Sequence, residues 1–107
     1  MISTDAIYEK LAYAPEVGGS CLVWKIRPRP GIAIGARAGT RFKNGRWVVI
    51  VNGRGYLAHR IVWALCTGSW PEFDLDHIDR NPENNLLTNL RLCPNGDKDN
   101  AQNKTKY

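Results

Sequence analysis

Leu75-Asp76-His77-Ile78-Asp79 opens the segment, residues 75–103, around which the rest of this 107-residue chain is expected to fold. The segment sets an imidazole beside a carboxylate and then crowds asparagines behind them: Asn81, Asn84, Asn85, Asn89, Asn95, Asn100 and Asn103. Asparagine favours left-handed turns and helix caps, and its amide oxygen is also a neutral ligand for a hard cation. Both uses are predicted here, some residues shaping turns and others forming a site.

Turn residues and apolar alternation give this segment the order strand, long loop, strand, helix. Residues 73–78 alternate and are predicted as a strand that ends near His77. Residues 79–85 have turn chemistry throughout, and residues 89–93 are predicted as a second short strand. Asp97 can cap a terminal helix over about residues 98–104.

The upstream part of the chain mixes helix and strand signals. The expected elements are a helix over 4–14, a strand over 21–26, an irregular Gly- and Ala-rich loop over 31–41, a strand over 46–51 and a helix from Ala58 that stops at Gly68. Asn52-Gly53 is a strong hairpin-turn signal between the second strand and Gly55-Tyr56-Leu57. The predicted fold class is therefore α+β.

Length and composition indicate one domain, residues 1–107, with a small core. The cysteines at positions 21, 66 and 93 are widely spaced and form no C-x-x-C pair, so neither a disulfide framework nor a structural zinc is expected. No apolar run approaches the roughly 20 residues of a membrane span, and no signal peptide is recognisable. A cytoplasmic protein without a membrane partner is the expectation.

Charge divides the chain into a basic and an acidic part. No acid lies between Glu16 and Glu72, whereas seven of the ten acids lie from Glu72 to Asp99. The acid-free interval holds nine bases: Lys25, Arg27, Arg29, Arg37, Arg41, Lys43, Arg46, Arg54 and Arg60. A basic half beside an acidic, amide-rich segment is typical of a polyanion-binding surface next to a cation site. The simpler alternative is a basic domain with scattered surface arginines.

The motifs of residues 75–103 resemble those of the HNH endonucleases. The resemblance rests on Asp76-His77-Ile78-Asp79, Asn84-Asn85, Asn89-Leu90-Arg91 and Asn100-x-x-Asn103, and is strongest to small phage-encoded and homing-type members with a ββα-metal finger. It extends upstream through His59-Arg60-x-Val62-Trp63 with Gly68-x-x-Pro71, and further to Pro15-Glu16-Val17-Gly18 and Leu22-x-Trp24, so that it covers roughly residues 13–103. The resemblance implies a C-terminal ββα-metal finger, residues 72–107, preceded by a helix and β-hairpin region, residues 1–71, that serves as a basic DNA-binding platform.

The resemblance also implies roles for individual residues. His77 would be the general base that takes a proton from the attacking water, and Asn89 would hold the loop and orient the His77 ring. Asp76 and Asn100 would bind one divalent metal ion, Mg²⁺ or Mn²⁺, leaving positions for water and phosphate. The products would carry a 5′-phosphate and a 3′-hydroxyl.

Two features depart from the commonest family pattern. Asn100 stands where many members have His, and ten residues separate Asn89 from Asn100, a slight expansion. Asn103, Asp99 and Asp97 therefore stay open as alternative second ligands.

The function that these patterns predict is a metal-dependent DNA endonuclease that nicks one strand of a duplex, acting as a monomer or weak dimer. DNA contacts are expected from Arg27, Arg29, Arg37, Arg41, Lys43, Arg46, Arg54, Arg91 and Asn103. A structural ion pair is an equal alternative for Arg91. A non-catalytic DNA-binding protein that keeps the fold is the second hypothesis, and a small protein–protein adaptor is the third.

Overall fold

The computed structural model describes residues 2–94 of the chain, and its α+β architecture confirms the predicted fold class. The elements are α1 (Thr4–Lys10), β1 (Leu11–Tyr13), η1 (Pro15–Val17), β2 (Leu22–Trp24), β3 (Thr40–Arg41), β4 (Trp47–Val51), β5 (Arg54–Leu57), α2 (Ala58–Thr67), β6 (Asp74–His77), η2 (Leu87–Asn89) and β7 (Leu90–Cys93). The strands form three small antiparallel sheets, in the orders β1-β2, β3-β4-β5 and β6-β7. The predicted helix over 98–104 lies outside the described residues.

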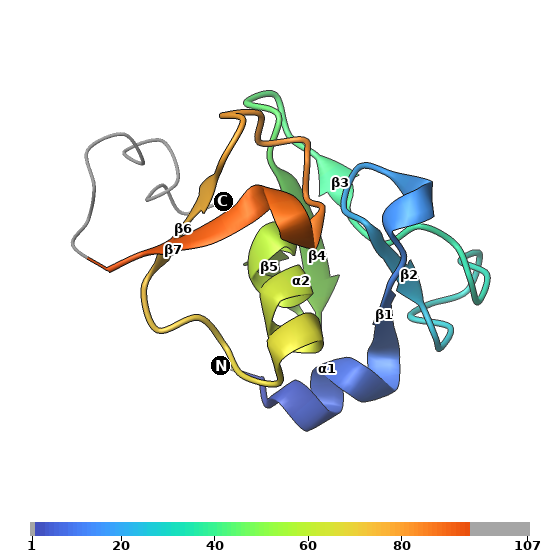
Figure 1. The fold of residues 1–107 in the computed structure, drawn as a ribbon. Helices are drawn as coiled ribbons and strands as arrows, with labels where there is room; N and C mark the ends of the chain where they lie inside the picture. The colour runs from blue at the N-terminus through green and yellow to red at the C-terminus, as the bar shows by residue number, and fades with distance from the viewer. Residues whose placement is uncertain (1, 95–107) are drawn as a thin grey trace.

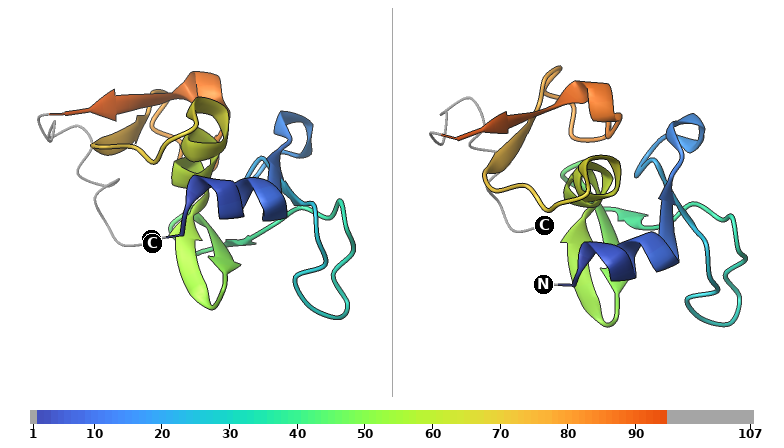
Figure 2. Two further views of the ribbon diagram at one scale, coloured as in Figure 1. Left: turned by 90° about the horizontal axis from the view of Figure 1, so that it is seen from below. Right: turned by 60° about the horizontal axis from the view of Figure 1, so that its bottom comes forward.

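Helix α2 is the centre of the molecule. Figure 1 shows it between the β4–β5 hairpin and the β6–β7 hairpin, and Figure 2 shows the same arrangement from two other directions. Ala58, Ile61, Val62 and Leu65 are buried along it, as their helical spacing predicts. Gly68 ends the helix in the left-handed conformation, at φ 86°. No helix of the described part is long and apolar enough to cross a membrane.

The N-terminal segment differs from its prediction. The helix expected over 4–14 ends at Lys10, and the chain continues as β1, in which Leu11 pairs with Trp24 of β2. Leu11 is buried, so pairing in a strand and packing in the core outweigh the weak helical periodicity of a short segment. By contrast, the Asn52-Gly53 turn is confirmed, because both residues have positive φ, 53° and 78°, and β4 pairs with β5 across them.

The β6–β7 hairpin holds the segment in which the sequence is richest in asparagine. Its register places Asp76 opposite Arg91 and His77 opposite Leu90. Beyond the last pair, the N–H of Ile78 donates to the carbonyl oxygen of Asn89 at 2.8 Å. The long connection over 79–89 therefore leaves and re-enters the hairpin at its His77 end.

Several hydrogen bonds within this connection meet at Asp79. Its carboxylate accepts hydrogen bonds from the Asn81 N–H (2.8 Å), from Asn84 Nδ2 (2.8 Å) and from Asn89 Nδ2 (2.9 Å). Its own N–H donates to Asn89 Oδ1 at 3.1 Å. The bonds from Asn84 and Asn81 hold the pKa of Asp79 below its ordinary value. Asp79 is thus a loop-capping residue, as its sequence context indicates.

The β3–β4 turn supports the same connection from outside. Arg41 forms a bidentate ion pair with Glu83, at 2.8 and 3.0 Å. A Cβ added to Gly45, which has φ 85°, would lie 3.1 Å from the side chain of Pro82. The turn over 42–46 therefore lies directly against the 79–89 connection, and this close approach requires a glycine.

We expect Asp79→Asn to lower the melting temperature by a few degrees near neutral pH, because it removes a shared acceptor in an exposed network worth about 1 kcal/mol. The folded pKa of Asp79 is depressed, so its contribution is full above the unfolded pKa of about 3.9 and is lost as pH falls through the folded value. Thermal melts at several pH values measure this difference, and the difference should close in acid.

The control is Glu72→Gln, which removes an exposed carboxylate just before the same hairpin. It should leave the melting temperature unchanged at every pH. A deficit of Asp79→Asn that persists at the acid end would show that the carboxylate charge is not the source of the stabilisation.

Candidate functional site

The adjacent acid and imidazole of the opening motif lie at the end of β6 and are both buried. Asp76 is 3% exposed and His77 is 1% exposed. Electrostatic interactions are stronger in such surroundings than in water, and an unpaired polar group there is costly. The groups that contact these two side chains therefore decide what the site can do.

The carboxylate of Asp76 is paired with an arginine across the hairpin. Arg91 Nε and Nη2 each lie 2.9 Å from Asp76 Oδ2. The pairing follows from the register, because residues directly opposite in an antiparallel pair face the same side. Arg91 thus makes the structural ion pair that was one of its two expected roles, and a DNA contact by its exposed side chain stays a prediction.

The ring of His77 is held by Asn85. His77 Nε2 lies 3.0 Å from Asn85 Oδ1, and Asn85 Nδ2 donates to the carbonyl oxygen of Gly19 at 2.8 Å. Since the Asn85 nitrogen is engaged by a carbonyl, its oxygen faces the imidazole, and the ring nitrogen must be the donor. This network assigns a hydrogen to Nε2 of His77, so Nδ1 is the ring nitrogen that Asn85 does not contact.

Gly19 is placed by a close contact with Trp47. The glycine has φ 57°, and a Cβ added to it would lie 2.6 Å from the Trp47 ring. Only glycine accommodates both the left-handed backbone and this contact. Arg37 covers the same ring, with its guanidinium carbon 4.7 Å from the ring centroid. The N-terminal region is therefore packed so that a backbone carbonyl reaches Asn85.

Asn89 binds the connection rather than the ring. Its side chain makes three hydrogen bonds, with the Asp79 N–H, the Asp79 carboxylate and the carbonyl oxygen of Asn84. The expectation that Asn89 holds the loop therefore agrees with the geometry. The hydrogen bond to the His77 ring comes instead from Asn85, because the amide of Asn89 is fully used by the loop.

A second histidine lies against the first. His59, in the first turn of α2, is 4% exposed, and its ring centroid lies 4.7 Å from that of His77 at an interplanar angle of 66°. Burial, followed by the proximity of His77, Arg46 and Arg60, lowers the pKa of His59 well below its ordinary value. His59 is therefore neutral at physiological pH.

The predicted DNA-contacting side chains differ in their surroundings. Those of Arg27, Arg29, Lys43, Arg54 and Arg91 are exposed. Arg37 and Arg41 are exposed too, but Arg37 lies over Trp47 and donates to the Val17 carbonyl oxygen, and Arg41 is paired with Glu83. Asn103 lies outside the described residues.

Arg46 does not fit the expectation of a DNA contact at the surface. Its side chain is 4% exposed, and its Nη1 atom is buried without a hydrogen-bond partner. Its place in the fold explains this: Arg46 directly precedes β4, whose side chains are mostly buried, and the turn before it packs against the 79–89 connection. The prediction that Arg46 contacts DNA at the surface is therefore wrong.

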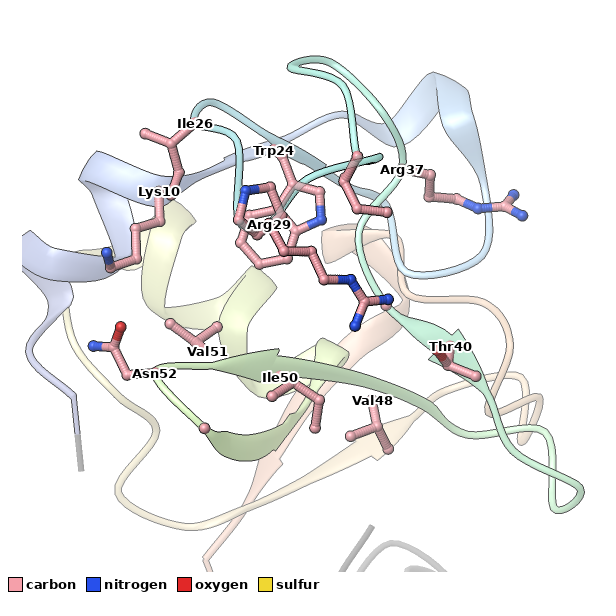
Figure 3. Close-up of a pocket in the computed structure, with 14 residues that line it drawn as sticks. Lys10, Trp24, Ile26, Arg29, Arg37, Thr40, Val48, Ile50, Val51 and Asn52 are labelled. Carbon is pink, nitrogen blue, oxygen red and sulfur yellow. The ribbon is translucent and has the colours of Figure 1, made fainter.

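A groove opens on the opposite side of the β4–β5 hairpin. It has a volume of about 400 Å³, its floor includes Val48 and Ile50, and Lys10 and Arg29 lie at its rim. No Asp or Glu is among the described residues that line it. Figure 3 shows Arg29 reaching across the opening, whereas the guanidinium of Arg37 points away from it. The groove combines an apolar floor with positive charge.

The end of β6 offers a carboxylate that suits a hard cation. Asp76 supplies carboxylate oxygen, the ligand type that Mg²⁺ and Mn²⁺ prefer. Within residues 2–94 there is no group of three or more His, Cys, Asp or Glu side chains that could hold a metal ion. The predicted second ligand, Asn100, and the alternatives Asn103, Asp99 and Asp97 lie outside the described residues.

Sequence reasoning assigned two of these neighbours lesser roles. Asn85 lies within the stretch of turn chemistry, residues 79–85, and His59 within the His59-Arg60-x-Val62-Trp63 motif, and neither was predicted to contact the His77 ring. The pair Asn84-Asn85 in the family resemblance was a signal for Asn85. Nothing in the local sequence indicated that Gly19 would accept its hydrogen bond.

Comparison with known proteins gives one match. Residues 56–102 match the family model described as HNH endonuclease, a range that begins in β5 and includes α2 and the β6–β7 hairpin. No curated protein and no solved structure is detectably similar to the chain. The match contains Asp76, His77, Asn85 and Asn89 together with His59. Residues 56–102 are thus similar to the HNH endonuclease family over a range that contains the Asp76-His77 motif.

Proposed function

We propose that the protein is a metal-dependent DNA endonuclease whose general base is His77. The observation that carries the proposal is the network Gly19–Asn85–His77, which engages Nε2 of the ring and so orients it. An imidazole has an ordinary pKa near 6.5, so it is suited to accept a proton at neutral pH. The similarity to the HNH endonuclease family supports a nucleic acid as the substrate.

The reaction requires one proton transfer to this chain. Nδ1 of His77 takes a proton from water, the water oxygen attacks phosphorus, and the bond from phosphorus to the 3′ oxygen breaks, with the leaving oxygen taking its proton from solvent water. The products then carry a 5′-phosphate and a 3′-hydroxyl. Asn85 keeps the ring from turning, and Asn89 fixes the loop from which Asn85 projects. Because His77 is 1% exposed, its surroundings must open to admit the phosphate.

Asp76 and Asn100 are the proposed protein ligands of one divalent cation, Mg²⁺ or Mn²⁺. Such a cation supplies positive charge against the phosphate and the leaving oxygen. Arg91 offsets the charge of the buried Asp76 carboxylate, at 2.9 Å. The assignment of Asn100 as a ligand rests on the sequence alone.

We further propose that residues 1–71 form the basic platform for duplex DNA and residues 72–107 the catalytic finger, within one domain. Exposed arginines with no acid among them support this assignment, since guanidinium groups match phosphate oxygens. Arg27 and Arg29 are better placed than Arg37 and Arg41, because the latter two already have partners within the protein. A single finger cuts one strand per encounter, so nicking is expected.

The burial of His77 favours a second candidate, a non-catalytic DNA-binding protein that retains the fold. In that case the buried Asp76–Arg91 pair and the Asn85–His77 contact would be purely structural. The two candidates differ in one outcome, cleavage by purified protein with a divalent metal ion.

We expect wild-type protein to nick supercoiled plasmid with Mg²⁺ or Mn²⁺ and not with EDTA. His77→Ala should lower the rate by roughly 10²- to 10⁴-fold, since a general base contributes about that factor, and added imidazole should restore part of it. DNA affinity should not change. Electrophoresis of the plasmid and filter binding measure the two quantities, and DNA ligase should reseal the nick without prior treatment.

Thr88→Ala, an exposed change in the same segment, is the control and should behave as wild type. Absence of nicking by wild-type protein with either metal would favour the non-catalytic candidate. Loss of DNA affinity in His77→Ala would show that His77 is structural.

The double variant Arg27→Gln, Arg29→Gln should weaken binding to all DNA sequences. The slope of log K against log salt should fall by about one unit for each lost phosphate contact. The matched control is Arg37→Gln, Arg41→Gln, which removes the same charge from side chains engaged within the protein. Fluorescence anisotropy over a salt series measures both. Equal losses in the two double variants would contradict the proposed surface.

A further inference from the structure

His59 makes a contact that packing alone does not explain. It lies in the first turn of α2, is 4% exposed, and meets the His77 ring edge to face at 4.7 Å. The other residues of this helix that are equally buried are all apolar: Ala58, Ile61, Val62, Ala64 and Leu65. Burying an imidazole among them costs free energy that an apolar residue would avoid. The position is thus unusual in its chemistry and in its neighbour.

The charges around His59 reinforce its neutral form. Burial is the largest cause of its lowered pKa, and His77, Arg46 and Arg60 add to it. Arg46 is itself buried with Nη1 unpartnered, so its positive charge is not offset there. These surroundings keep His59 neutral where its ring meets that of His77.

We propose that His59 is a positioning residue for the proposed base, holding the plane of the His77 ring by the edge-to-face contact while Asn85 holds its Nε2. The inference rests on the proposed function of His77. One hydrogen bond fixes the direction of Nε2 but allows the ring to rotate about that bond. The edge-to-face contact with His59 restricts this rotation and so contributes to the direction of Nδ1.

The match to the HNH endonuclease family model begins ahead of the hairpin. The matched range includes the start of α2, where His59 lies. Helix α2 thereby supplies both the packing surface for the core and a contact for the imidazole. A ring held from two directions keeps a near-attack geometry, and misplacement by about 1 Å can cost roughly 10²-fold in rate.

Two substitutions separate positioning from simple packing. His59→Leu fills the position with an apolar side chain but removes the ring. We expect kcat to fall by about tenfold or more with KM unchanged. His59→Phe keeps an aromatic ring and should restore most of kcat. The control is Leu65→Ala, a buried change later in α2, which should lower the melting temperature by several degrees and leave kcat as in wild type.

A second readout does not depend on cleavage. Long-range ¹H–¹⁵N correlation spectra of the imidazoles report which ring nitrogens of His77 carry hydrogen and how the surroundings of the ring differ between variants. We expect wild-type protein to show His77 with hydrogen on Nε2, His59→Phe to preserve this, and His59→Leu to give a mixture of tautomers or broadened signals.

Each outcome decides the proposal. Unchanged His77 signals and unchanged kcat in His59→Leu would overturn it, and so would equal impairment in His59→Leu and His59→Phe. If wild-type protein never cleaves DNA, the spectra still test whether His59 orders the ring. In that event the proposed function is wrong, and the spectra alone decide whether His59 positions the His77 ring.

Discussion

The amide of Asn85 is the interaction on which the site depends. One end donates to the Gly19 carbonyl oxygen and the other accepts from His77 Nε2, so one side chain joins the N-terminal region to the β6–β7 hairpin. Each partner is buried or nearly so, and a buried polar group without a partner costs about 1–3 kcal/mol. Removal of Asn85 would therefore disturb both the ring and the packing that supports it.

Much of the remaining architecture can be understood as support for that amide. Trp47 packs on Gly19 and fixes its carbonyl group, while Asp79 and Asn89 fix the loop from which Asn85 projects. The β3–β4 turn holds the same loop from outside through Gly45. The hairpin and the N-terminal region thus share one set of contacts, which explains why they fold around a single core.

Local sequence patterns predicted the elements that depend on local physics. The Asn52-Gly53 turn, helix α2 with its Gly68 stop and the two strands of the hairpin follow from turn chemistry and periodicity. The helix over 4–14 was too long, because pairing of Leu11 with Trp24 depends on a residue distant in the chain. Periodicity within a short segment carries no information about such a partner.

The residues of the site also fall into those that local sequence patterns predict and those that depend on tertiary contacts. Asp76 and His77 were found from their adjacency and the family resemblance. The partners of the His77 ring, Asn85 and His59, were not, because the contacts depend on how the 79–89 connection and α2 fold against β6, which local patterns do not show. Burial of Arg46 was missed for a related reason: its charge suggested a surface position, while its place beside β4 directs the side chain inward. Tertiary packing decided each of these outcomes.

The most direct test of the account is the plasmid-nicking rate of Asn85→Leu, which keeps the side-chain volume but makes no hydrogen bond. The account predicts a fall of at least about tenfold with DNA affinity unchanged, because the His77 ring loses its anchor. Asn84→Ala, which loosens the same loop without a contact to the ring, should fall much less. A rate for Asn85→Leu equal to wild type would contradict the account.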